Sequence, residues 1–134
     1  QMFDTGREPK CDADTPWYQS MDKQGAWDLI HFRRLWEKSD FTQGKNQQTI
    51  FGNIPLENKN YPVAFGNKDY LLVYFPQGGE RTIYLPSMKA SKRSLKWMNP
   101  RNGRITFYQN TTADTIPVSS PTKGKGNDWV LIIE

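Results

Sequence analysis

The chain has 134 residues, which is enough for one domain and hardly enough for two. Aromatic residues make up 13% of it, a content that argues against disorder. The formal net charge of +4 is unevenly placed: residues 1–40 carry six Lys or Arg against eight Asp or Glu, whereas residues 41–134 carry twelve against six. A single Cys and a single His exclude a disulfide framework and the common zinc sites, and no apolar run is long enough to span a membrane.

The first 40 residues predict an acidic lead-in that ends in a helix. Residues 1–14 show no helix or strand periodicity. Thr15 and Pro16 are typical of a helix start, so we expect a short helical turn over 16–21. A longer helix is expected over about 24–38, with one apolar face that packs on another part of the protein. The residues of that face are Ala26, Leu29, Phe32 and Trp36.

From residue 41 to residue 134 the sequence predicts a basic β-domain. Short apolar runs recur there, separated by Gly, Pro and Asn, a pattern typical of sandwiches and barrels. We therefore predict a mainly β protein, an antiparallel β-sandwich of about seven to eight strands with an N-terminal helical segment. The segment 110–127 is expected to be mostly loop. The expected strands are 48–52, 62–66, 69–75, 81–85, 93–98, 104–109 and 128–133, with a weak one near 115–118.

Two turns and two central strands stand out within this β-domain. The segments 76–79 and 99–103 are rich in Pro, Gly and Asn, so each is expected to join two strands. The runs YLLVYF and WVLII are apolar at successive positions, which predicts strands that are buried on both faces. We expect both of these strands to lie centrally in their sheets.

Patterns that could support catalysis or metal binding are incomplete. The segment 12–14 begins like a calcium loop, but the required Gly and the closing Glu are missing. Cys11 and His31 are the residue types of a nucleophile and its base, yet no third orienting group is evident. His31 is instead expected at the edge of the helix's buried face. The sequence therefore predicts no metal ligand and no cofactor.

The carboxylates of the β-domain do not form a recognisable glycosidase pair. Glycosidases need two carboxylates at a defined separation. Asp69 and Asp128 each precede an apolar strand, where a turn or capping role is the simpler interpretation. We therefore assign no catalytic residue. The acidic residues available are Glu57, Asp69, Glu80, Asp114, Asp128 and Glu134.

Ligand-binding candidates come from aromatic and basic residues. Flat aromatic rings can stack on sugar rings, but Trp97 and Trp129 alternate with other apolar residues and are expected in the core. The stretch 89–104 holds six basic residues and no acid, so it is either a polyanion-binding surface or a solvated face. The aromatic candidates for ligand binding are Trp17, Tyr18, Tyr84 and Tyr108.

Three stretches of the sequence resemble a known family. They are TPWYQSMDKQGAWDLIHFRRLWE, then YLLVYFPQGGERTIYL with KWMNPRNGRI, then GKGNDWVLIIE. Together they resemble the C-terminal part of bacterial apiosidase-like glycoside hydrolases, in which a (β/α)-barrel catalytic domain precedes a small β-sandwich described as a collagen-binding domain of a collagenase. The family's strand–turn, hairpin and terminal patterns correspond to 73–78, 97–103 and 128–131, with Asn99 where an Asp is usual.

The resemblance implies an architecture and a compartment. It implies that a catalytic barrel lies upstream, that 16–38 correspond to the last barrel helices, and that 1–7 border the sugar cleft of the complete enzyme. The start at Gln1, without a Met or a signal peptide, leads us to expect a fragment of a longer protein. By the same resemblance the protein is expected to be secreted, periplasmic or on the cell surface.

Three functions are compatible with these features. The first is a non-catalytic accessory module that scaffolds a glycan-degrading hydrolase and helps to target it to carbohydrate. The second is an adhesive domain for collagen or another extracellular protein, with the stretch 89–104 making the contact. The third, and the least favoured, is a nucleic-acid-binding barrel. In that case the stacking platforms would be Tyr84, Trp97 and Tyr108, beside Lys92, Lys96 and Arg104.

Overall fold

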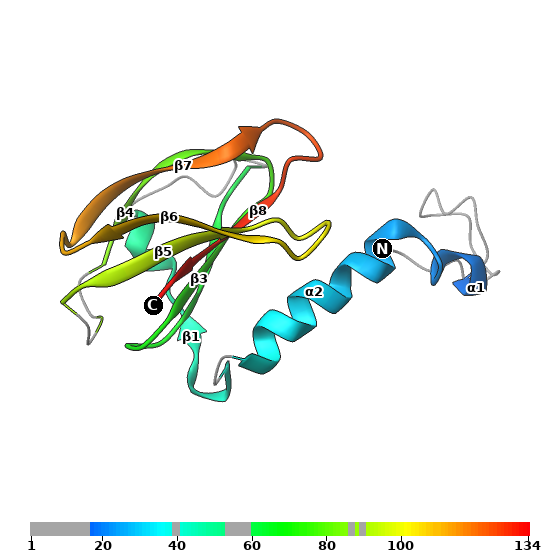
Figure 1. Cartoon of the computed structure of the whole chain (residues 1–134), viewed down its shortest axis with the longest axis horizontal. Coiled ribbons are helices and arrows are strands. Elements are labelled where there is room, and N and C mark those ends of the chain that lie inside the picture. The colour runs from blue at the N-terminus through cyan, green and yellow to red at the C-terminus, as the bar shows by residue number, and fades with distance from the viewer. Residues whose placement is uncertain (1–16, 39–40, 53–59, 86–87, 89–90) are drawn as a thin grey trace.

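The computed structural model describes residues 17–38, 41–52, 60–85, 88 and 91–134. Two antiparallel sheets face each other in these ranges, and a helix precedes them (Figure 1). The predicted β-sandwich with an N-terminal helical segment is therefore confirmed. The proposed domain boundary at residue 40 falls on residues 39–40, which lie outside the described ranges.

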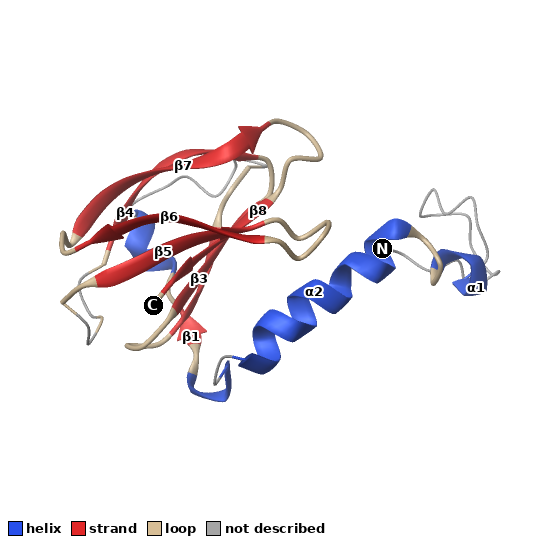
Figure 2. Ribbon diagram, in the orientation of Figure 1, coloured by secondary structure: helices blue, strands red, loops and turns tan. Residues whose placement is uncertain are grey.

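The elements occur in the expected order, with helices first and strands after them (Figure 2). The helices are α1 (Trp17–Ser20), α2 (Gln24–Lys38) and the short 3-10 turns η1 (Phe41–Gln43) and η2 (Gln48–Phe51). The strands are β1 (Lys45–Asn46), β2 (Val63–Gly66), β3 (Leu71–Phe75), β4 (Gly78–Tyr84), β5 (Arg93–Met98), β6 (Ile105–Thr111), β7 (Thr115–Lys123) and β8 (Trp129–Ile133).

The larger sheet has six strands in the order β1-β2-β3-β8-β5-β6, and the smaller sheet pairs β4 with β7. The two strands that are apolar at successive positions, β3 and β8, are neighbours in the middle of the larger sheet, as predicted. Their register places Leu71 opposite Ile133 and Val73 opposite Leu131. Side chains alternate across a strand, so each of these strands contributes to two separate cores.

The first core lies between the two sheets. Val73 and Leu131 of the larger sheet and Ile83 of β4 are fully buried there, and Ile116 and Val118 of β7 join the same cluster. Trp97 is also in this core, with 2% of its surface exposed, as the sequence predicts. Burial of these side chains on both sheets is what holds the sandwich together.

The second core lies on the opposite face of the larger sheet, under α2. Leu35 of the helix clusters there with Leu72, Val130 and other residues of the sheet. Trp36 stacks on Phe65 of β2, with ring centroids 5.0 Å apart and planes 18° apart. Leu29 was expected on this packed face but is 65% exposed. The helix contacts the second core through Phe32, Leu35 and Trp36, which all lie in its second half. One turn earlier, at Leu29, the same helix face is not covered by the sheet.

The strand expected over 48–52 is wrong, because this segment forms the 3-10 turn η2. The reason is visible in the side chain of Gln48. Its Nε2 donates to the Pro62 carbonyl at 2.6 Å, and its Oε1 accepts from the Ala64 backbone N–H at 3.1 Å. The side-chain amide therefore supplies the pairing that a further strand would have made beside β2. Ile50 and Phe51 are still buried, as apolar strand residues would have been.

The segment 110–127 is more regular than the sequence suggested. β6 continues to Thr111, and β7 runs through nine residues rather than the four expected. The Ser, Thr and Pro content favoured a loop, but Ile116 and Val118 alternate into the core while Pro117 is exposed between them. Among the described residues β7 pairs only with β4, so its other edge is open there, and an open edge is where proline is tolerated in a strand.

Candidate functional site

The four aromatic candidates from the sequence do not form one surface. Tyr18 lies on α1 and is 56% exposed, whereas Tyr84 ends β4 in the smaller sheet and is 47% exposed. Tyr108 lies on β6, at an edge of the larger sheet, where its ring centroid is 6.1 Å from that of Trp97. Trp17 begins α1, and its side chain is outside the part that the structure describes. A shared sugar-stacking platform built from these residues is therefore not present among the described side chains.

The nucleic-acid arrangement also needs correction. Trp97 was considered as a stacking platform, but 98% of its surface is covered and its ring packs edge-on to Phe75 at 5.4 Å. A base cannot reach a ring in this position. Tyr84 and Tyr108 remain accessible but belong to different sheets.

Much of the basic stretch 89–104 is used inside the protein. Arg93 is buried, donates to the Ala113 carbonyl at 2.9 Å and pairs with Asp114 at 3.0 Å. Lys96 forms an ion pair with the side chain of Glu134. Arg101 forms an ion pair with Asp128. This stretch therefore fixes strand ends and loops more than it presents a continuous cationic surface.

A compact polar cluster lies at one end of the larger sheet. Arg101, in the turn between β5 and β6, donates to Asp128 Oδ1 at 2.6 Å and to the Gly126 carbonyl at 2.7 Å. The hydroxyl of Tyr74 donates to Asp128 Oδ2 at 3.4 Å. The guanidinium of Arg101 also lies 5.6 Å from the ring centre of Trp129. Asp128 is thus an ion-pair partner that ties three segments together, a larger role than the expected turn or cap.

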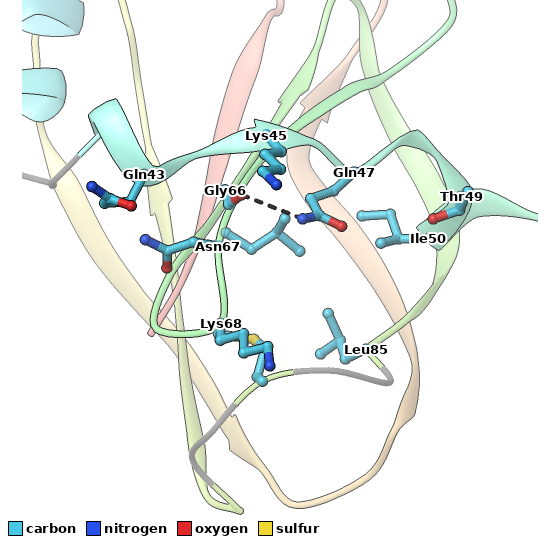
Figure 3. A pocket seen from close by; sticks show the side chains of 11 residues that line it. Gln43, Lys45, Gln47, Thr49, Ile50, Gly66, Asn67, Lys68 and Leu85 are labelled. Atoms are coloured by element: carbon cyan, nitrogen blue, oxygen red, sulfur yellow. Dashed lines mark hydrogen bonds between the residues drawn. The ribbon is translucent and has the colours of Figure 1, made fainter.

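A polar groove with a volume of about 440 Å³ opens beside β1 and η2, at the other edge of the larger sheet from β6 (Figure 3). Its apolar lining is Ile50, Leu71, Leu85 and Met88. Its polar lining is Gln43, Lys45, Gln47, Thr49, Asn67 and Lys68, and Gly66, the last residue of β2, completes it.

Hydrogen bonds hold two of the groove's amides in place. Gln47 donates from its backbone N–H to the Ala64 carbonyl at 3.0 Å and from its side-chain Nε2 to the Gly66 carbonyl at 3.3 Å (Figure 3). Asn67 Oδ1 accepts from the backbone N–H groups of Asp69 and Tyr70, at 2.7 and 3.1 Å. The Nδ2 group of Asn67 makes neither of these bonds. Asp69 accordingly lies in a turn, as predicted from the sequence.

Sequence reasoning missed the groove. Its polar residues come from two short segments, 43–49 and 66–68, that carry no motif. The available signal was a local concentration of Gln, Asn and Lys without an acidic residue in either segment. The turn η2 and the pairing of β1 with β2 bring the two segments together. The sequence predicts a strand where η2 lies, so this arrangement was not expected.

The ranges that the structure describes contain no group of three or more His, Cys, Asp or Glu able to hold a metal ion. Cys11, Glu57 and the segments 1–7 and 12–14 lie outside those ranges. His31 is half-buried beside the β5–β6 turn, where a Cβ on Gly103 would meet its ring. The described helices include none that is long and apolar enough to cross a membrane.

Residues 46–134 match the family described as "Putative collagen-binding domain of a collagenase". The chain belongs to this family. No curated protein sequence matches the chain.

Solved structures with the same fold are found among glycoside hydrolases. One, described as "Glycoside hydrolase", has a TM-score of 0.79 and 19% identity over 98% of this chain. A glycoside hydrolase family 5 protein from Bacteroides vulgatus ATCC 8482 has a TM-score of 0.79 and 20% identity over 89% of this chain. This chain spans only 30% and 26% of those two chains, respectively.

The three sequence patterns that resemble the collagen-binding-domain family come together in the polar cluster. The strand–turn pattern contributes Tyr74, the hairpin pattern contributes Arg101, and the terminal pattern contributes Asp128 and Trp129. Arg101 contacts both the Trp129 ring and the Asp128 carboxylate, and that carboxylate also accepts from the Tyr74 hydroxyl. We conclude that these residues stabilise the fold where β3, β8 and the β5–β6 turn meet.

The pKa of Tyr74 reports on this cluster. Burial raises the pKa of its phenol above the usual value, and the negative charge and hydrogen bond of Asp128 raise it further, while the charge of Arg101 acts in the opposite direction. Because the folded state holds the neutral phenol, the unfolded chain loses this proton first as the pH rises. The associated stability is therefore present below about pH 10, the ordinary tyrosine pKa, and is lost as the pH rises through the folded value.

Replacing Asp128→Asn is expected to lower the pKa of Tyr74. The substitution removes the negative charge while burial remains, so the pKa should fall only part of the way to its usual value. The measurement is the phenolate absorbance as a function of pH, with the Tyr74→Phe variant subtracted to isolate this residue. An unchanged or higher pKa in the Asp128→Asn protein would contradict the contact between the two groups.

Proposed function

We propose that this chain is a non-catalytic accessory module of a glycan-degrading hydrolase, held against the catalytic domain and contributing to carbohydrate targeting. The observation that carries the proposal is the apolar surface that helix α2 leaves uncovered. The second half of the helix packs on the sandwich through Leu35 and Trp36. Apolar residues are also exposed on the helix, at 60% for Trp27, 65% for Leu29 and 40% for Ile30.

The proposed occupant of this exposed surface is a catalytic barrel in the same polypeptide. Isolated exposed apolar residues are ordinary, but several on one helix mark an interaction surface. An apolar groove along α2, lined by Leu29, Ile30 and Trp36 among others, belongs to the same surface. The similar glycoside hydrolases support this arrangement, because one of them matches 98% of this chain and is more than three times as long. We also propose a secreted, periplasmic or cell-surface location, where such an enzyme would meet its glycan.

The test uses the 134-residue chain with immobilised polysaccharides and a reducing-sugar assay. We expect retention on at least one glycan and no release of reducing sugar. Release of sugar by the purified chain would overturn the non-catalytic part of the proposal. Failure to bind any glycan would overturn the targeting part and leave the scaffolding part. The scaffolding part is tested with the chain joined to a catalytic barrel, where Leu29→Glu should disrupt the contact between the two. The control Lys23→Glu, at an exposed position before α2, should leave that contact intact.

The second candidate is adhesion to collagen, which the description of the family favours. The structure weakens the surface first considered for it, because Arg93, Lys96 and Arg101 of the basic stretch have internal partners. Lys92 and Arg104 of the same stretch are exposed. Pull-down with fibrillar collagen at physiological salt separates the two candidates: retention on collagen without retention on any glycan would replace the first proposal by the second.

A further inference from the structure

The groove beside β1 and η2 differs from the rest of the basic surface in its charge balance. Lys45 and Lys68 both line it, and among the described lining residues there is no carboxylate. Neither lysine has an ion-pair partner within the ranges that the structure describes, whereas Lys96 and Arg101 are both paired with acids. Two unneutralised ammonium groups at one groove favour a ligand that carries negative charge.

The other lining groups favour a ligand with hydroxyls and an apolar face. Thr49 supplies a hydroxyl, and the amides of Gln47 and Asn67 are held in position by their own hydrogen bonds. Because Gln47 donates to the Gly66 carbonyl through Nε2, its Oε1 is left to accept from a ligand hydroxyl. Asn67 is bonded through Oδ1, which leaves its Nδ2 group as a donor. Fixed groups of this kind reduce the ordering cost of binding.

The apolar part of the lining completes this chemistry. Ile50, Leu71 and Leu85 are buried side chains that line the groove. A ring with C–H groups on its face and hydroxyls at its rim would contact both parts of the lining at once. The volume, about 440 Å³, is within the range of small-molecule sites. The described lining contains no aromatic residue, so a nucleic-acid base would find no ring to stack on.

We infer that this groove binds an anionic sugar unit of a polysaccharide, with Lys45 and Lys68 contacting its acidic group and Gln47, Thr49 and Asn67 contacting its hydroxyls. The acidic group is a carboxylate or a sulfate, because a lysine ammonium acts as a point charge and serves both. This inference rests on the proposed role in glycan targeting and adds the site and the ligand class to it.

The experiment is calorimetric titration of the 134-residue chain with soluble oligosaccharides of three kinds. A galacturonate oligomer carries carboxylates, a chondroitin sulfate oligomer adds sulfates, and a cellulose oligomer is neutral. The groove variant is Lys45→Gln with Lys68→Gln. The matched control is Lys123→Gln with Lys125→Gln, which removes the same charge from exposed positions outside the groove.

We expect one or both acidic oligomers to bind more tightly than the neutral one. The groove variant should weaken that binding by about ten-fold or more, because it removes the two positive charges whose hydrogen bonds to the acidic group are charge-assisted and therefore stronger than neutral ones. The control variant should bind within about two-fold of the natural chain, because surface charges outside a site contribute little. Both lysines are exposed, so the folded structure should persist, and thermal unfolding of each variant checks this.

Four results would overturn the inference. Equal weakening in both double variants would indicate general attraction to polyanions, and binding of neither acidic oligomer would exclude the site. A single-stranded oligonucleotide that binds as tightly, and is lost in the groove variant, would exclude the sugar assignment. Binding of neutral oligomers alone would refute the groove and leave the targeting role intact. Cleavage of a groove-bound acidic oligomer would support the groove but refute the non-catalytic role.

Discussion

Replacing Trp97→Ala should reduce the free energy of unfolding by about 3–5 kcal/mol, the usual cost of deleting a large buried aromatic side chain. Trp97 is 2% exposed in the core between the sheets, and its ring lies 5.4 Å from Phe75 and 6.4 Å from Trp129. Since domains of this size are stable by only about 5–15 kcal/mol, the variant should approach the limit of folding. Urea unfolding followed by far-ultraviolet circular dichroism measures the loss.

Trp27→Ala is the matched control, because it removes the same side chain from a position that is 60% exposed. We expect its stability to change by no more than about 0.5 kcal/mol. If Trp97→Ala does not fold, Trp97→Phe keeps the measurement possible. The indole Nε1 of Trp97 is buried and has no hydrogen-bond partner among the residues that the structure describes, so phenylalanine loses part of the packing but also removes an unsatisfied donor. Similar small effects for both Ala variants would contradict the burial of Trp97.

The central part of this fold was predictable because it depends on local alternation of apolar residues. β3 and β8 are apolar at successive positions, and in short segments this pattern favours a strand that is buried on both faces. The turns at 76–79 and 99–103 were also predictable, since Gly78 and Gly103 adopt positive φ values of 62° and 70°. Each of these features is specified by residues adjacent in sequence.

The errors arise where distant side chains decide the local structure. The side-chain amide of Gln48 bonds to the backbone of Pro62 and Ala64 and takes the place of strand pairing. The residues next to Gln48 in the sequence give no indication of these two partners. The polar groove depends on the same turn. Leu29 has the helical spacing of a buried residue, but the sheet contacts α2 mainly through its second half. The sequence places Asp128 at the start of a strand but does not reveal its ion pair, because the partner Arg101 lies far away in the sequence, in the β5–β6 turn.

Of the two glycines that begin β4, Gly78 and Gly79, replacing Gly78→Ala should be the more destabilising substitution. Its φ of 62° belongs to the left-handed region, which costs about 1–2 kcal/mol for a residue with a Cβ. A Cβ there would also collide with the backbone carbonyl of Thr122 and lie 2.5 Å from Ser120 Oγ. Backbone cannot move aside as a flexible side chain can, so overpacking adds about 1–3 kcal/mol.

The neighbouring glycine separates these two contributions. Gly79 also has a positive φ, 102°, but a Cβ added there would meet nothing within 4 Å. Gly79→Ala should therefore cost only the conformational part, and the two variants should differ by about 1 kcal/mol or more in urea unfolding. Gly78 is the glycine of the strand–turn pattern, and its close contact with Ser120 and Thr122 at the end of β7 gives that residue a physical reason. This end of β7 lies beside Trp129, whose Nε1 donates to Thr122 Oγ1 at 2.9 Å, so Gly78→Ala should also shift the tryptophan fluorescence. Equal losses in the two variants would show that the end of β7 does not pack against Gly78, and would separate the strand–turn pattern from the cluster around Asp128.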